Sequence, residues 1–167
     1  DRSYITRSCM ILLTTVLIIL FFCIMLLVGQ IQGTARVVNY AGLVRGKTQR
    51  IIKLENAGQP HDEMIESVSS YIKGLRYGSD ELKLVRLDDA AFQVKMNELN
   101  RYFEKLCKEI LLIREKGYEN TNIIEMSETF FNICDEATGL AEAYSQRKAT
   151  ALNRLEQIVF VDIGGLI

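Results

Sequence analysis

The longest uninterrupted apolar run lies near the start of the chain, from residue 9 to residue 28, and contains no charged residue. About 20 apolar helical residues cross the hydrocarbon core of a bilayer, whereas the apolar region of a signal peptide is only about 7–15 residues long. Arg2 and Arg7 before the run, and the small residues at 33–35, also fit a cleaved signal. The length of the run favours a retained transmembrane helix over residues 9–29.

A second apolar run occupies residues 158–167 and is interrupted only by Asp162. We expect it to be the start of a second transmembrane helix. Residues 1–8 then form a cytoplasmic tail, and residues 30–157 form one extracytoplasmic domain between the two spans. The distribution of positive charge supports this orientation weakly, because Arg2 and Arg7 precede the first span but Arg36 follows it closely.

Between these runs, apolar residues recur with alternating spacings of four and three, which is typical of helices packed lengthwise. The clearest series predicts a helix that Asp88 or Asp89 caps and that Gly117 ends. Its apolar residues are Phe92, Met96, Leu99, Phe103, Leu106, Ile110 and Ile113.

Three further helices follow from the same spacing. The helix over residues 30–55 buries Val37, Ala41, Val44, Thr48 and Ile51; a shorter helix after Pro60 buries Ile65, Val68, Ile72 and Leu75. The last helix carries two adjacent stripes: Phe131, Cys134, Thr138, Ala141 and Ser145, and Met126, Phe130, Ile133, Ala137, Leu140 and Tyr144. The prediction is an all-α, antiparallel up-down four-helix bundle, continuous with transmembrane helices.

Composition excludes several classes of function. The net charge of -1 lacks the basic excess of a nucleic-acid binder. His61 is the only histidine and lies beside Pro60 in a turn, so we expect no catalytic residues and no metal site. No phosphate-binding loop is present, no cofactor is expected, and this segment is not expected to be an enzyme. Cys107 and Cys134 are favoured as separate buried thiols over a disulfide.

One stretch departs from this balance of charges. The helix over residues 30–55 carries five basic residues and no acidic residue before Glu55; the basic residues are Arg36, Arg45, Lys47, Arg50 and Lys53. A basic run of this kind is a candidate anion site. The alternative is a basic face paired with acidic neighbours such as Asp135, Glu136 and Glu142.

Arg45 is the strongest candidate within the basic run. It lies on a stripe with Val38, Gly42, Gln49 and Ile52, beside the apolar series, and is therefore expected to be partly buried. A buried guanidinium needs a partner, which is either a protein carboxylate or an anion. Guanidinium binds planar oxyanions through two parallel hydrogen bonds.

Helix length indicates what lies opposite Arg45. At about 1.5 Å per residue, Arg45 stands roughly 25 Å beyond the first span. The same distance along the last helix reaches Thr138, Ala141 and Ser145, whose small side chains would leave space for a ligand.

The stretch from Ala35 to Glu55, ARVVNYAGLVRGKTQRIIKLE, resembles the periplasmic-box helix of nitrate/nitrite sensor kinases and of type IV pilus chemotaxis-transducer sensor domains. The shared pattern is an asparagine, Ala41-Gly42, an arginine three residues on and a second arginine after Gln49. The likeness is greatest to clostridial-type sensors joined to diguanylate cyclase or histidine kinase domains. Residues 117–146 are similar to those proteins as well.

The resemblance implies a dimeric four-helix sensor between two membrane spans. In the nitrate sensors the first box arginine contacts the anion at the dimer axis, and that role maps onto Arg45. Gly42 permits close approach, and Arg50 matches the second box arginine. The chain departs from the nitrate sensors at residues 46–48, where Gly-Lys-Thr replaces bulkier residues, so the resemblance does not specify nitrate.

The expected function is an extracytoplasmic ligand-sensing input module in a bacterial cell membrane. The expected partners are a small anion, the membrane and a second copy of the chain, with no nucleic acid. The predicted ligand-binding residues are Arg45, Gly42, Gln49, Arg50, Ala141 and Ser145. The alternative is a membrane-anchored helical bundle that binds a protein partner and has no small-molecule ligand.

Overall fold

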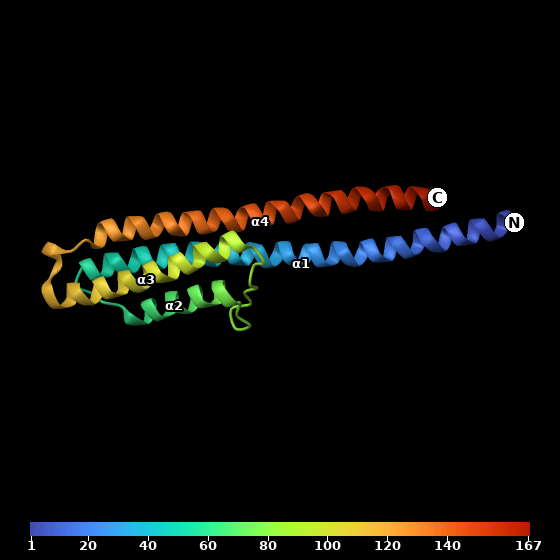
Figure 1. Cartoon of the computed structure of the whole chain (residues 1–167). Coiled ribbons are helices and arrows are strands. Elements are labelled where there is room, and N and C mark those ends of the chain that lie inside the picture. Colours follow the sequence, from blue (N-terminus) through green and yellow to red (C-terminus); the bar gives the residue numbers. More distant parts are fainter. The chain divides into compact units, whose positions relative to one another are not determined.

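A computed structural model describes residues 1–167 and contains four α-helices and one short 3₁₀ helix (Figure 1). The all-α prediction is confirmed. The helices are α1 (Arg2–Asn56), α2 (Asp62–Tyr77), α3 (Ala90–Lys116) and α4 (Ile123–Leu166), and η1 (Tyr118–Asn120) precedes α4. The only β-type contact is one isolated bridge between Ser79 and Leu84.

The chain divides into two compact units. The terminal unit comprises Asp1–Gln32 and Ser145–Ile167, and the core unit comprises Gly33–Tyr144. Helices α1 and α4 each contribute residues to both units. Residues 30–32 and 145–157 of the expected extracytoplasmic domain therefore belong to the terminal unit.

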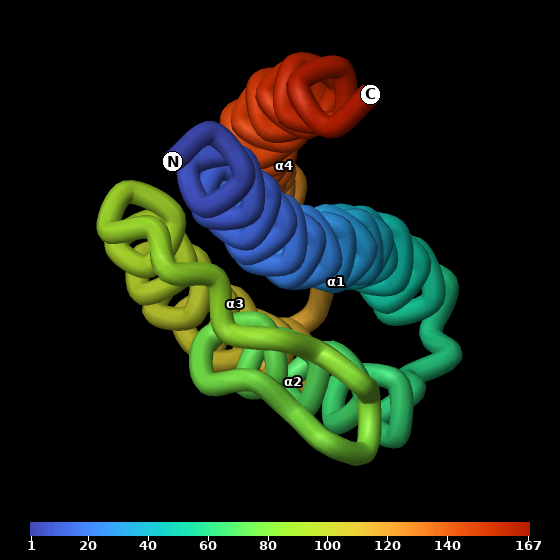
Figure 2. Tube along the Cα trace, turned by 90° about the vertical axis from the view of Figure 1, so that its right-hand side faces the viewer, coloured from blue at the N-terminus to red at the C-terminus, as the bar shows by residue number.

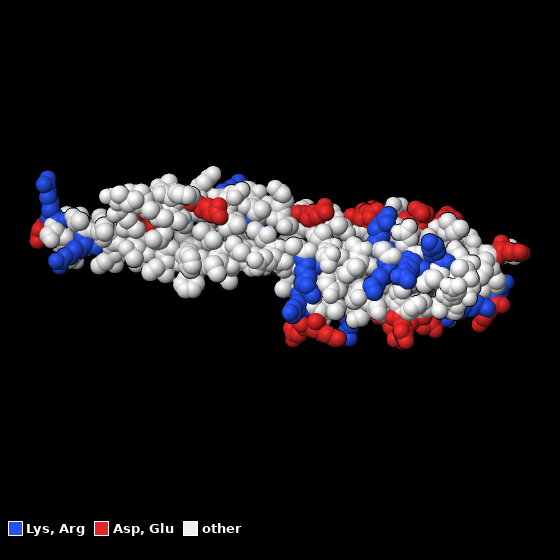
Figure 3. All heavy atoms as spheres, turned by 180° about the vertical axis from the view of Figure 1, so that it is seen from behind, with Lys and Arg blue, Asp and Glu red and all other residues white.

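Helix α1 is unbroken over its 55 residues and includes the apolar run. It is the one helix that is long and apolar enough to cross a membrane, judged by length and composition alone. None of its most apolar 18-residue window is buried within the protein, unlike the core helix of a soluble protein. Figure 3 shows the same contrast, since charged side chains crowd the core unit and are sparse along the apolar segments.

Within the terminal unit, α1 and α4 line an open apolar groove of about 390 Å³, formed by Leu17, Ile18, Phe21, Ile24, Val159 and Ile163. Asp162 is the only charged residue of the second apolar run, and it is turned inward with 7% of its surface exposed. Its Oδ2 atom has no hydrogen-bond partner.

One hydrophobic core runs through the core unit and receives side chains from all four helices and from residues 78–89. Every residue of the predicted α1 and α3 series is buried, with at most 3% exposed. Most of the two α4 stripes is buried as well; Thr138, Ser145, Met126 and Leu140 are half-buried. The helical spacing therefore identified the buried faces correctly.

Helices α2 and α3 pack side by side and are joined by residues 78–89, as the end-on trace shows (Figure 2). Gly78 begins this segment with φ +81°, and a Cβ there would lie 3.3 Å from the Leu84 carbonyl oxygen. Both features favour glycine. Asp89 caps α3 by accepting a hydrogen bond from the Phe92 amide at 3.1 Å, and Gly117 ends the helix with φ +85°.

Cys107 and Cys134 are both free thiols within the core unit. Cys134 is fully buried and Cys107 is half-buried. Burial raises the pKa of the Cys107 thiol to about 11 and that of the Cys134 thiol to about 12. Both side chains therefore stay protonated at neutral pH and act as small apolar groups.

Candidate functional site

The exposed side of α1 in the core unit carries an open groove of about 550 Å³. Its lining residues, Gly46, Gln49, Arg50, Lys53 and Leu54, all belong to α1. Each of these positions has another lining position three or four residues away, so together they follow one side of the helix for about two turns. The space beside Gly46 is open, since an added Cβ would meet no atom within 4 Å.

Two cations of this groove have no protein partner. Arg50 and Lys53 are exposed, and neither makes a hydrogen bond or an ion pair. Gln49 is also exposed beside them and can donate a hydrogen bond through its amide. The groove therefore offers two positive charges and a neutral donor to an acidic ligand. Figure 3 shows basic side chains gathered amid uncharged atoms on one face of the core unit.

Arg45 lies one turn before Gln49 on α1 but does not line the groove, and its side chain contacts α4. Its Nε donates a hydrogen bond to Oδ1 of Asp135 at 2.9 Å, and its Cζ lies 5.0 Å from the centre of the Phe131 ring. The side chains of Arg45 and Asp135 are 40% and 58% exposed. An ion pair with this exposure contributes only about 0–1 kcal/mol to stability.

The other two candidate acidic partners, Glu136 and Glu142, make no ion pair with the basic residues of α1. Glu136 accepts from Lys95 of α3 at 2.5 Å, and Glu98 accepts from the same ammonium group at 2.8 Å. These two bonds raise the pKa of Lys95 above its ordinary value. Glu142 is exposed and makes no ion pair. Of the three carboxylates considered as partners, Asp135 alone binds the basic face of α1.

The structure separates the predicted ligand-binding residues. Gly42, Gln49 and Arg50 are exposed on α1, whereas Ala141 is fully buried in the core and has no surface open to a ligand. Ser145 belongs to the terminal unit. The residues expected opposite Arg45 were Thr138, Ala141 and Ser145; Asp135 and Phe131 of α4 occupy that place instead.

No family model, curated protein sequence or solved structure matches the chain. The resemblance to nitrate and pilus sensors therefore stays a prediction from residues 35–55 and 117–146.

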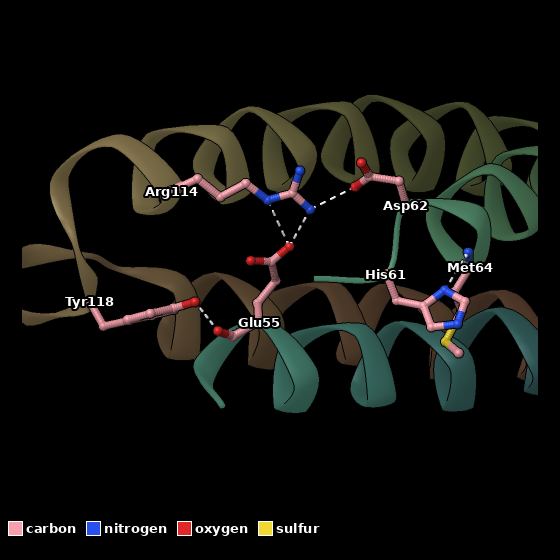
Figure 4. Close-up of polar contacts among 6 residues, drawn as sticks. All are labelled: Glu55, His61, Asp62, Met64, Arg114 and Tyr118. Atoms are coloured by element: carbon pink, nitrogen blue, oxygen red, sulfur yellow. Dashed lines mark hydrogen bonds and ion pairs between the residues drawn. The ribbon is translucent and has the colours of Figure 1, made fainter. Parts of the chain in front are cut away.

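A buried ion pair at one end of the core unit was not foreseen from the sequence (Figure 4). Glu55, at the end of α1, is 1% exposed. Its Oε1 accepts hydrogen bonds from Nε of Arg114 at 3.0 Å and from Nη2 of the same side chain. Arg114 Nη2 also donates to Oδ1 of Asp62 at 2.7 Å, and the Tyr118 hydroxyl donates to the Glu55 backbone carbonyl.

These four residues join the end of α1, the start of α2, the end of α3 and η1. The two carboxylates raise the pKa of Arg114 above its ordinary value. The only sequence signal for the cluster was Glu55, an acidic residue that ends a long basic run. His61 lies nearby and caps α2, because its Nδ1 accepts from the Met64 amide at 3.2 Å. It has no role in the groove.

The cluster predicts a specific response to acid. The hydrogen bond from Arg114, and then its positive charge, lower the pKa of the Asp62 carboxyl below the ordinary value. A lowered folded-state pKa gives stability that is present above the unfolded-state pKa of about 3.9 and is lost as pH falls through the folded-state pKa. We expect the melting temperature of Asp62→Asn to fall less than that of the parent between pH 5 and pH 2, measured by circular dichroism at about 0.5-unit steps.

The matched control for this measurement is Glu66→Gln, which removes an exposed carboxylate from the same helix. It should retain the acid sensitivity of the parent. Equal slopes for the parent and Asp62→Asn would show that the Arg114–Asp62 contact carries no pH-dependent stability.

Proposed function

We propose that this chain is the extracytoplasmic input module of a bacterial transmembrane signalling protein and that it binds a small anion on the basic face of α1. The observation that supports it is the groove in which Arg50 and Lys53 lie exposed without protein partners. Exposed helices of soluble proteins usually mix charges of both signs, so an unpaired basic groove favours an acidic ligand. The resemblance of residues 35–55 to sensor helices supports the same class.

The proposed topology is an antiparallel up-down bundle over residues 30–157, held by a membrane helix over residues 9–29. The exposure of the apolar window of α1 supports the membrane helix. The run at 158–167 begins the second span. A diguanylate cyclase, histidine kinase or chemotaxis-type domain would lie beyond it and supply the output, and no catalytic role is assigned to the present segment.

The proposed assembly is a homodimer in which the basic faces of two α1 helices meet. One helix alone lines the groove, so a second copy would supply its missing walls. Gly42 and Gly46 lie on this face and permit close backbone approach, since neither has any atom within 4 Å of an added Cβ. A bound anion would also reduce the repulsion between the two sets of cations.

Binding would act on the output through α1 and α4, because both helices continue from the core unit into the terminal unit. An anion shifts such an equilibrium only if it binds one arrangement of these helices more tightly than the other.

One observation favours a second function, that of a bundle which binds an acidic protein partner. Arg45 already has a carboxylate partner in Asp135, as expected if the basic face is mainly structural. In this case the groove would accept acidic side chains rather than a free anion. Melting of the chain in the presence of small anions separates the two functions.

The test uses the full chain in detergent micelles. Its melting temperature is measured with sodium nitrate, nitrite, sulfate, phosphate and acetate, with sodium chloride at matched ionic strength as the reference. An anion at one hundred times its Kd should stabilise the folded state by about 2.7 kcal/mol. Arg50→Ala should abolish this shift, because it removes a free cation from the groove.

The matched control is Arg101→Ala, which removes an exposed and unpaired arginine from α3. It should respond to the anion as the parent does. Equal shifts in both arginine variants would place the anion elsewhere. The absence of a shift with all five anions would reject the anion sensor and favour the protein-binding bundle.

A further inference from the structure

Arg45 stands next to the groove without contributing to its lining. Gln49, one turn further along α1, is part of the lining, and Gly42 lies one turn before Arg45 on the same side. Residues four apart on a helix are neighbours, with Cβ atoms about 5–6 Å apart. The space beside Gly42 is open, because an added Cβ would meet nothing within 4 Å. A long arginine side chain at position 45 therefore has free space on the side of the groove.

The contact that holds Arg45 away from the groove is a weak one. Asp135 accepts one hydrogen bond, from Nε, while Nη1 and Nη2 of Arg45 have no partner. Both side chains are exposed, so water can replace the bond at little cost. The guanidinium also lies over the ring of Phe131, with its Cζ atom 5.0 Å from the ring centre.

We propose that Arg45 exchanges partners: it binds Asp135 in the absence of ligand, and it turns to the groove to bind the anion together with Arg50 when ligand is present. This inference rests on the proposed function and adds its regulation. Asp135 is then a built-in competitor that lowers the apparent affinity for the anion. Occupancy of the groove would break the Arg45–Asp135 contact, which joins α1 to α4.

The exchange also restricts the class of ligand. The anion has to bridge two guanidinium groups, so it needs at least two acceptor oxygens. It has to replace a carboxylate, so nitrate and small carboxylates such as acetate fit better than chloride, which offers no oxygen acceptors.

The test compares the parent with Asp135→Asn, as full chains in detergent, by isothermal titration with sodium nitrate and separately with sodium acetate. Ionic strength is held constant with sodium chloride. Removal of a competing exposed ion pair should tighten anion binding by about two- to five-fold. The matched control is Glu142→Gln, which removes an unpaired acidic charge from the same helix and should leave Kd unchanged.

The decisive measurement repeats Asp135→Asn in an Arg45→Ala background. The exchange predicts no further effect there, since the competition acts through Arg45. Tighter binding in that background would show that Asp135 merely repels the anion, and would overturn the exchange.

Anion binding by the parent, Asp135→Asn and Arg50→Ala also tests the partner exchange and the anion sensor separately. If nitrate or acetate binds the parent and Asp135→Asn equally, and Arg50→Ala abolishes binding, the exchange is wrong and the anion sensor stands. If neither anion binds any variant, the exchange is wrong, and the five-anion screen decides whether the sensor survives. Circular dichroism of each variant should match the parent, because all substituted side chains are at least partly exposed.

Discussion

Arg114→Ala should lower the free energy of unfolding of the core unit by about 3 kcal/mol, although Arg114 itself is partly exposed. The reason lies in its partner. Glu55 is 1% exposed, and the bonds that satisfy its Oε1 atom both come from Arg114. Its Oε2 atom already lacks a partner. The variant would leave a buried carboxylate without its counter-charge, which costs far more than the loss of a surface ion pair.

Urea denaturation of the full chain in detergent, followed by near-ultraviolet circular dichroism, measures this effect. The chain has no tryptophan and seven tyrosines, and all of the tyrosines except Tyr4 lie in the core unit, so the signal reports that unit. Glu55→Gln should restore part of the stability of Arg114→Ala, because it removes the unpaired charge. Arg101→Ala is the control, with an expected change within about 0.5 kcal/mol. A loss no larger than that of the control would mean that water already satisfies Glu55.

Phe130→Ala should cost about 3–5 kcal/mol, because it removes a large and fully buried side chain and leaves a cavity. The Phe130 ring lies at the centre of an aromatic group from α3 and α4. Its centre is 6.5 Å from that of Tyr102, 5.7 Å from that of Phe103 and 6.3 Å from that of Phe131. The neighbouring Phe131 also supports Arg45, so loosening of this group should weaken the candidate site.

The same denaturation experiment tests this variant, with Phe130→Leu and Val94→Ala beside it. Phe130→Leu keeps most of the apolar volume and should cost less than Phe130→Ala. Val94 is 66% exposed on α3, so its truncation should change stability by no more than about 0.5 kcal/mol. Similar values for the two alanine variants would contradict the burial of Phe130.

The sequence was sufficient to predict the helices and their buried faces, since regular spacing of apolar residues depends only on helix periodicity. The α3 series from Phe92 to Ile113 is buried throughout. The caps were partly predictable: Asp89 and Gly117 act as expected. At the start of α4, the Asn122 backbone carbonyl accepts a hydrogen bond from the Met126 amide.

The sequence offered Asp135, Glu136 and Glu142 as possible partners of Arg45, but it could not show which of them makes the contact. Residues of α1 and α4 were matched by their equal distance along each helix from the membrane, which places a partner only to within a turn or two. The offset between two packed helices depends on their connections, and the spacing of apolar residues does not encode it. The residue found opposite is Asp135, one turn before Thr138. The Glu55–Arg114 contact joins residues 59 positions apart and depends on the packing of three segments. No local pattern indicates such a contact.

The ion pair at Glu55 is buried and the pair at Arg45 is exposed, so polar contacts hold α1 more firmly at Glu55 than at Arg45. Glu55, Arg114 and Tyr118 fix one end of α1, whereas Arg45 is joined to α4 by a replaceable contact. If that contact opens, α1 would pivot about its Glu55 end instead of sliding as a whole. Arg45 lies about 15 Å along the helix from Glu55 and Gly33 about 33 Å, so a small sideways displacement of α1 at Arg45 would be about doubled where α1 leaves the core unit.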